Sequence, residues 1–329
     1  MKLATAETIN PSLRPPRPPL ARYAPRHSGS GMDGSYSFLC FGEALWDAWP
    51  DRRVPGGAPM NVALGLSRLG ADVRLLSRVG ADASGRELLA YIAAQGLDIG
   101  SIQVDPSVPT GTVRVDASDP IDVTYEICSP AAWDFIGFLP QESRSDADVV
   151  ICGSLAARHE VSRQTLLQLL GAAALGVVDV NLRPPFVDRQ VIGSLLERAD
   201  CVKVNEAELA LLCSWEGIRV APDDLRSAVD AWARRRGFAT VAVTRGARGA
   251  CCWSRGRWSQ HPGYRVEVLD TIGCGDAFLA RWLWETSRGS EPDVALARAC
   301  AVGALVATRE GATPVVAEEE VRALVDRPD

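Results

Sequence analysis

The chain has 329 residues, of which 47% are hydrophobic and 23% are charged, a balance typical of a globular protein with a large core. The formal net charge of −6 at pH 7 argues against a nucleic-acid-binding surface, because such a surface needs a basic stripe to displace counterions from phosphates. No long stretch is free of polar residues, so the sequence predicts no helix that crosses a membrane.

Nine cysteines and three histidines bear on location and on metal binding. The cysteines form no C-x-x-C pair and several lie within apolar runs, which favours buried, reduced thiols in a cytoplasmic protein. The histidines are scattered, which argues against a zinc site built on histidine.

The first 35 residues differ in composition from the rest of the chain. They are rich in proline, arginine, serine and glycine, and repeated proline prevents a stable helix. We therefore predict a disordered tail over residues 1–35, followed by one folded domain over residues 36–320.

Short apolar runs and helical patterns alternate from Tyr36 onward. The runs predict strands at 38–41, 73–79, 149–152, 177–180, 201–204, 240–243 and 264–269. Helical spacing of apolar residues predicts helices at 61–69, 84–95, 162–175, 190–198, 206–212, 224–236 and 277–284. This alternation predicts a three-layer α/β/α fold with a mostly parallel central sheet, in which ligands lie beyond the carboxyl ends of the strands.

One segment, residues 101–127, interrupts this alternation. Its apolar and polar residues alternate with a period of two, which predicts strands with one solvent-exposed face. We interpret residues 102–128, together with 46–56, as a small β-sheet lid over the α/β body.

The nonapeptide Asp270–Phe278 carries the strongest functional signal. Gly273 and Gly275 allow a sharp turn that points backbone N–H groups into one space at the start of a helix, where the helix dipole favours negative charge. Asp276 falls in the first turn of that helix, where a carboxylate can accept a proton from an attacking hydroxyl. The sequence therefore predicts an anion hole made by the amides of Gly273, Cys274 and Gly275, with Asp276 as general base.

Two other interpretations of this nonapeptide stay open at this point. It could be an ordinary glycine turn with an aspartate at a helix N-terminus. It could also be a dinucleotide fingerprint, although Phe278 stands where the third glycine of G-x-G-x-x-G belongs. No G-x-x-x-x-G-K-[ST] motif occurs, which excludes a P-loop.

The nonapeptide resembles the D-T-x-G-A-G-D-x-F signature of the ribokinase-like (PfkB) carbohydrate kinase family, with Cys274 where alanine is usual. Because backbone amides make the anion hole, a small side chain at this position should be tolerated. The start of a helix should also favour the thiolate form of Cys274.

Four further stretches resemble elements of the same family, in the family's order: residues 42–47, 55–61, 203–208 and 244–249. The resemblance implies a sugar site made by Asp47, Gly56, Gly57 and Asn61. It implies an ATP site at Asn205, Thr244, Gly246 and Gly249, with Glu208 serving Mg²⁺ through water. Asp270 and Ile272 are the implied local candidates for K⁺, and dimerisation through the lid strands is implied as well.

The stretch Asp179–Pro185 and several others resemble bacterial fructokinases, which implies fructose as the substrate and Arg183 at the sugar site. An arginine there could equally recognise a substrate carboxylate, so 2-keto-3-deoxygluconate kinase remains an alternative. Ribokinase is a further alternative. A catalytically silent sugar sensor is an alternative from a different functional class, and an NAD-dependent dehydrogenase is a third.

Overall fold

A computed structural model describes residues 36–116, 124–138, 147–221 and 223–327. The predicted tail at 1–35 lies outside the described residues. None of the helices in the described ranges is long and apolar enough to cross a membrane.

Nine strands of the described chain form the main sheet, in the order β13-β12-β11-β10-β9-β8-β1-β4-β5. All neighbours are parallel except the β11–β12 and β12–β13 pairs. β8 and β9 are buried at every residue, which explains their uninterrupted apolar sequence. The strands are β1 (Ser37–Phe41), β4 (Asp72–Gly80), β5 (Ile102–Asp105), β8 (Val149–Gly153), β9 (Leu175–Asp179), β10 (Cys201–Asn205), β11 (Thr240–Thr244), β12 (Ala250–Ser254) and β13 (Arg257–His261).

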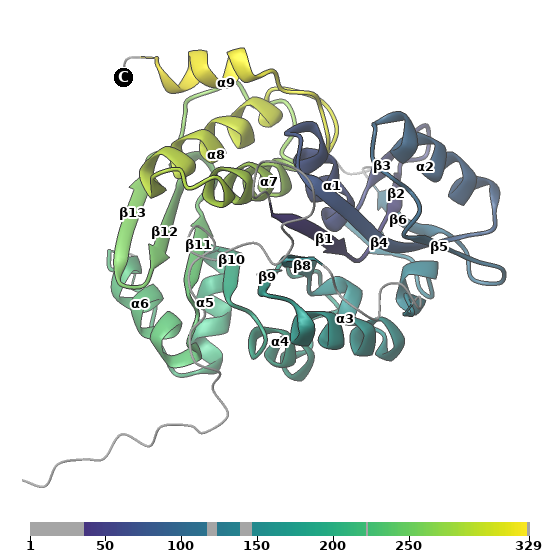
Figure 1. Ribbon diagram of the computed structural model, residues 1–329, viewed down its shortest axis with the longest axis horizontal. Coiled ribbons are helices and arrows are strands. Elements are labelled where there is room, and N and C mark those ends of the chain that lie inside the picture. Colours follow the sequence, from purple (N-terminus) through teal and green to yellow (C-terminus); the bar gives the residue numbers. More distant parts are fainter. Residues whose placement is uncertain (1–35, 117–123, 139–146, 222, 328–329) are drawn as a thin grey trace, which may run out of the picture.

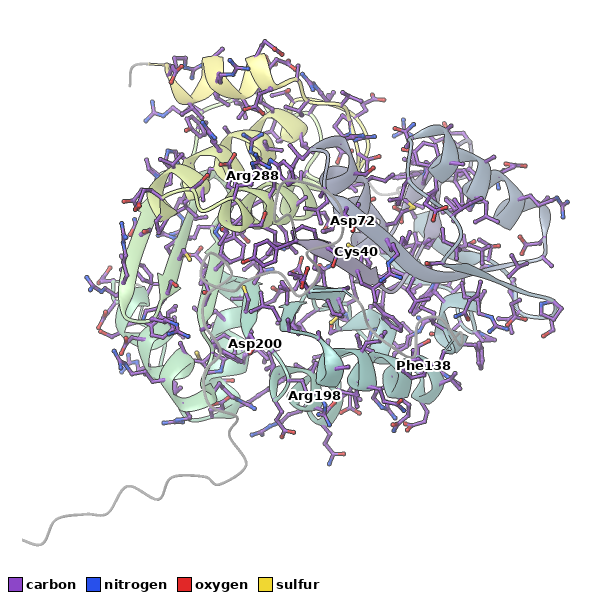
Figure 2. The ribbon with its side chains drawn as sticks, viewed as in Figure 1. Cys40, Asp72, Phe138, Arg198, Asp200 and Arg288 are labelled. Atoms are coloured by element: carbon purple, nitrogen blue, oxygen red, sulfur yellow. The ribbon has the colours of Figure 1, made fainter. Side chains whose placement is uncertain are left out.

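Helices cover both faces of this sheet (Figure 1). One apolar cluster joins the sheet to α1 (Ala58–Arg68), α2 (Ala83–Ala94), α7 (Cys274–Ser287) and α8 (Pro292–Ala307). The other joins it to α3 (Glu160–Ala172), α4 (Arg189–Leu196), α5 (Glu206–Trp215) and α6 (Leu225–Arg236). α9 (Glu318–Val325) packs outside α8. Successive residues of β1 enter opposite clusters, so that Cys40, labelled in Figure 2, faces one layer and Phe41 the other.

The α/β/α architecture and the parallel sheet are confirmed, and the predicted elements lie within a few residues of their observed bounds, with one exception. The strand predicted at 264–269 is wrong, because these residues have no regular secondary structure. β13 is the last strand on its side of the sheet, so no strand of the described chain pairs with the segment. Val268 and Leu269 are 58% and 63% exposed, whereas Tyr264 packs against the core.

A second sheet of four strands, β3-β2-β6-β7, lies at one side of the molecule (Figure 1). Its strands are β2 (Leu45–Ala48), β3 (Arg53–Gly56), β6 (Gly111–Asp116) and β7 (Thr124–Ile127). The expected lid range of 102–128 starts too early, because β5 pairs with β4 in the main sheet. The part of the expected lid at 117–123 lies outside the described residues.

Removing one partner of a buried ion pair on α7 should destabilise the fold. Arg281 Nη2 lies 2.7 Å from Glu285 Oε1, and both side chains are 4% exposed. Glu285→Ala should lower the free energy of unfolding by about 1–3 kcal/mol, because the buried guanidinium of Arg281 then keeps only Glu318, a partly exposed partner. Urea denaturation followed by circular dichroism measures this loss.

The matched control is Glu319→Ala on α9, whose side chain is 81% exposed and lies 4.0 Å from Arg322. This change should alter stability by less than about 0.5 kcal/mol. Equal losses for the two variants would contradict the assignment.

Candidate active site

The turn that precedes α7 requires a glycine. Gly273 has φ = 75°, in the left-handed region, and a Cβ placed there would lie 2.0 Å from the carbonyl oxygen of Ala312. The chain therefore passes directly beneath the 311–313 segment and enters α7 at Cys274.

Backbone N–H groups are available at this turn. Among the described residues, the N–H groups of Gly273 and Gly275 have no hydrogen-bond partner, and that of Cys274 makes only a long contact, 3.4 Å, to Thr271 O. These groups stand at the positive end of the α7 dipole, so the turn can bind an anion.

Asp276 is the third residue of α7 and is half-buried. Its Oδ2 accepts a hydrogen bond of 2.8 Å from Asn61 Nδ2, which links the beginnings of α1 and α7. Burial raises the pKa of Asp276 to about 6 and Asp179 adds to the rise, whereas Lys203, the Asn61 hydrogen bond and Arg183 act in the opposite direction. A carboxylate with this pKa is ionised at neutral pH and can accept a proton.

Lys203 is a site residue that the motif comparison did not single out. Its Nζ donates to Asp179 Oδ2 at 2.7 Å, and a Cβ built on Gly275 would lie 3.1 Å from this Nζ. Burial lowers the pKa of Lys203, but Asp179 and Asp276 outweigh that effect and keep it raised, so the ammonium is charged. A fixed cation therefore lies next to the anion hole. In the sequence, Lys203 could have been noticed because it is the one charged residue within an apolar strand.

The four residues expected to bind sugar come together at the junction of β2, β3 and α1. A Cβ on Gly56 would lie 2.4 Å from Asp47 Oδ2, so only glycine lets that carboxylate lie over the backbone. Gly57 has φ = 116° and approaches the carbonyl oxygen of Glu43 just as closely. Burial raises the pKa of Asp47 to about 6, which Arg183 partly offsets.

Arg183 is exposed and donates to the carbonyl oxygen of Leu182 at 3.2 Å. Its charge lowers the pKa of Asp47 and Asp276, so its guanidinium lies within electrostatic reach of both carboxylates. Glu208 holds this segment in place, because its Oε1 accepts the Leu182 N–H at 2.8 Å.

The side chains expected to serve Mg²⁺ have structural partners as well. Glu208 Oε2 accepts the Asn205 N–H at 2.8 Å, and Asn205 Oδ1 accepts the Glu208 N–H at 2.9 Å, which forms a capping box on α5. Glu208 is buried and both of its oxygens accept backbone N–H groups. No group of three or more His, Cys, Asp or Glu side chains in the described ranges could hold a metal ion. Protein ligands alone therefore do not fit Mg²⁺, whereas a water-mediated contact to an ion held by phosphates fits.

The expected nucleotide residues follow β11. The sheet register pairs Asn205 with Thr244, so the two lie side by side at the carboxyl ends of β10 and β11. Gly246 and Gly249 have φ of 56° and 74° and make the tight turn into β12, closed by the bond from Arg245 N to Gly249 O at 2.8 Å.

Asp270 ties the loop before α7 to the segment after α8. Its Oδ1 accepts the Ile272 N–H at 2.9 Å, and its Oδ2 accepts the Gly311 N–H at 3.1 Å. Both oxygens are thus engaged in shaping the loop.

The expectation that Cys274 forms a thiolate is wrong. Burial raises the pKa of Cys274 to about 11, and Asp270 and Asp276 add to the rise. The thiol therefore stays protonated at neutral pH.

Glu43 is the other residue that the motif comparison did not assign. It follows β1, is 3% exposed, and its Oε2 has no hydrogen-bond partner. Burial raises the pKa of Glu43 to about 7, with Arg183 and Arg158 acting against the rise and Asp276 adding to it.

Comparisons with known proteins agree with this geometry. Residues 45–319 match the pfkB family carbohydrate kinase. The chain is 33% identical to a fructokinase of Klebsiella pneumoniae over 297 residues, covering 82% of this chain and 93% of that protein. It is 31% identical to fructokinase-1 of Oryza sativa subsp. japonica over 300 residues, covering 84% and 90%.

Solved structures of fructokinases have the same fold. A fructokinase from Xylella fastidiosa with bound ATP superposes with a TM-score of 0.77 at 25% identity, covering 88% of this chain and 98% of that one. A fructokinase double mutant from Vibrio cholerae O395 with fructose, ADP and potassium ion bound superposes with a TM-score of 0.74 at 25% identity, covering 89% and 99%.

The two glycines of the turn predict different defects. Gly273→Ala should destabilise the fold, by about 1–3 kcal/mol from backbone strain and by a similar amount from overpacking. Gly275→Ala should fold, because the added methyl would lie 3.1 Å from Lys203 Nζ, a contact that a shift of a few tenths of an ångström relieves, but it should lower kcat at least about 10-fold by crowding the anion hole. Thermal denaturation and ADP release measured on both variants test this; a stable, fully active Gly275→Ala would contradict the anion hole.

The raised pKa of Asp276 predicts a pH-dependent stability. The folded state holds the proton more tightly than the unfolded state, so ionisation above pH 6 costs stability. Asp276→Asn should therefore be more stable than the wild type above pH 7, by at most about 3 kcal/mol, and the difference should vanish towards pH 4. Melting temperatures at pH 4–8 measure it. Asp51→Asn, on an exposed turn, should show no such trend.

Proposed function

Because the chain belongs to the pfkB family of carbohydrate kinases, we propose that it transfers the γ-phosphoryl group of ATP to a hydroxyl of fructose, with Asp276 as the general base. The chain is a sugar phosphotransferase of the fructokinase type. The observation that carries the residue assignment is the position of Asp276, whose carboxylate stands beside unoccupied backbone N–H groups and is oriented by Asn61.

The step is an in-line displacement. Asp276 accepts the proton of the attacking sugar hydroxyl, the oxygen bonds to the γ-phosphorus, and the bond to the β–γ bridging oxygen breaks to release ADP. The amides of Gly273 and Gly275 and the ammonium of Lys203 stabilise the charge on the moving phosphoryl group. Asp47, Gly56, Gly57 and Asn61 hold the sugar. Thr244, Gly246 and Gly249 contact the nucleotide, and Asn205 lies beside them.

We propose that Mg²⁺ accompanies ATP and neutralises its phosphate oxygens, with Glu208 in contact only through water. We propose K⁺ at carbonyl oxygens of the loop that Asp270 shapes, near Ile272. The potassium-bound Vibrio cholerae structure supports this choice of ion.

The charges near the site favour a neutral sugar over a sugar acid. Lys203 pairs with Asp179 and also acts on Asp276, whereas Arg183 acts on both Asp47 and Asp276. A substrate carboxylate would add a third negative charge, which disfavours 2-keto-3-deoxygluconate. The presence of Asp276 and both glycines argues against a silent sensor.

We propose one kinase domain over residues 36–320, covered by β2, β3, β6 and β7 as a lid, and a homodimer formed through the outer strands of that sheet, β3 and β7. A cytoplasmic location is supported by nine free cysteines.

Asp276→Asn should lower kcat by about 100-fold or more, because the proton of the attacking hydroxyl loses its acceptor. ATP affinity should stay nearly unchanged. A coupled ADP-release assay over fructose, ribose, tagatose, 2-keto-3-deoxygluconate and nucleosides measures turnover, and calorimetry measures ATP binding. Asp51→Asn is the matched control and should behave as the wild type. A variant with most of its kcat would remove Asp276 from the mechanism, and strong turnover of the keto acid alone would replace fructose as the substrate.

A further inference from the structure

Buried polar atoms without partners concentrate at one end of the sheet. Among the described residues, nine such side-chain atoms occur, and five of them belong to Glu43, Asn61, Ser154, Arg158 and Asp179. These residues follow or end the adjacent strands β1, β8 and β9, or begin α1. Buried polar atoms normally find a partner, so this cluster indicates a ligand that supplies several hydrogen bonds.

Arg158 is the most tightly held member of the cluster. Its Nε and Nη2 donate to the two oxygens of Asp134 at 2.7 and 2.8 Å, and Nη2 also donates to Cys128 O at 3.1 Å. The rings of Trp133 and Phe186 lie 3.9 and 4.5 Å from its guanidinium carbon. Only Nη1 has no partner. A guanidinium fixed in this way presents one donor in a set direction.

Glu43 lies on the loop that packs against the same region. A Cβ on Gly42 would lie 3.1 Å from the Cβ of Ala156, so this loop touches η3 (Leu155–Ala157), the turn that immediately precedes Arg158. Gly57 holds the other side of the loop through its close approach to Glu43 O. Arg158 is close enough to lower the pKa of Glu43. An acceptor and a donor are thus on neighbouring segments, and the atoms Glu43 Oε2 and Arg158 Nη1 have no hydrogen-bond partner.

We propose that Glu43 and Arg158 bind one non-reacting hydroxyl of the sugar, which donates to Glu43 Oε2 and accepts from Arg158 Nη1. A hydroxyl is both a donor and an acceptor, so a single hydroxyl can form hydrogen bonds to both Glu43 Oε2 and Arg158 Nη1. This inference rests on the proposed sugar kinase function. It makes Glu43 a specificity-determining residue that reads the presence of that hydroxyl, distinct from the base Asp276.

The test measures the kinetics of the wild type and of one variant, Glu43→Gln, with fructose and with a set of fructose analogues. Glu43→Gln keeps the size of the side chain, and fructose analogues that each lack one hydroxyl remove the partner instead. With fructose, Glu43→Gln should raise KM about 10-fold or more with kcat changed only a few-fold, because a hydrogen bond to a charged group is lost. For the wild type, kcat/KM should be about 10-fold or more lower with one of the deoxyfructoses than with fructose. For Glu43→Gln, the decrease with the same analogue should be clearly smaller.

Stability separates this role from a structural one. Glu43→Gln should not lower the melting temperature without sugar, since it replaces a buried carboxyl group whose Oε2 has no partner by a neutral amide. Glu310→Gln, whose side chain is 74% exposed, is the matched control and should leave both KM and the melting temperature unchanged.

Two failures can be told apart. If fructose is phosphorylated but every deoxy analogue loses the same factor with both proteins, the role of Glu43 is rejected and the proposed function stands. If no sugar in the panel releases ADP, the proposed function falls and this inference falls with it.

Discussion

The hydrogen bond from Asn61 to Asp276 joins two helices whose sequences are 215 positions apart, and the site depends on it. Asn61 belongs to α1, which follows the small sheet, whereas Asp276 belongs to α7, which follows the long excursion through the other helical layer. The bond fixes the carboxylate in one orientation beside the Gly273 and Gly275 amides. Because the two helices also pack directly against each other, the base is oriented by the body of the fold and not by a loop.

Charge balance is the second constraint on the site. Burial raises the pKa values of Asp276, Asp47 and Glu43, so ionising these carboxyl groups in the folded protein lowers its stability. Lys203 and Arg183 offset part of this cost, and Asp179 holds Lys203 in place. An incoming phosphoryl group and an uncharged sugar suit this balance, because the cations that face the phosphate are already fixed.

The sequence predicted the architecture well because parallel strands buried on both faces produce continuous apolar runs, as in Val149–Gly153. It failed at 264–269, where alternating residues resemble a strand but no strand of the described chain pairs with them. It did not predict α8, whose apolar residues surround the helix and leave little periodicity. At the site, glycines and acidic residues in known motifs were visible, whereas Lys203 and Glu43 acquire a role only when β1, β10 and α7 come together in space. The protonated state of Cys274 could not be predicted either, because its pKa is raised by burial and by Asp270, which depend on the folded structure.

The unpartnered atoms at the ends of β1, β8 and β9 connect stability to binding. Each such atom lowers the stability of the free protein, by about 1–3 kcal/mol on general grounds, and five of the nine found among the described residues belong to residues at this end of the sheet. A fold under selection for stability alone would replace Glu43 or Ser154 with apolar groups, because both are almost fully buried. The presence of these residues is explained if a ligand forms hydrogen bonds to their unpartnered atoms. The free energy that these atoms do not contribute to folding then contributes to ligand binding. The site then distinguishes its substrate by which hydroxyls are present, since a missing hydroxyl leaves a buried charge unsatisfied and is rejected more strongly than a change in apolar shape.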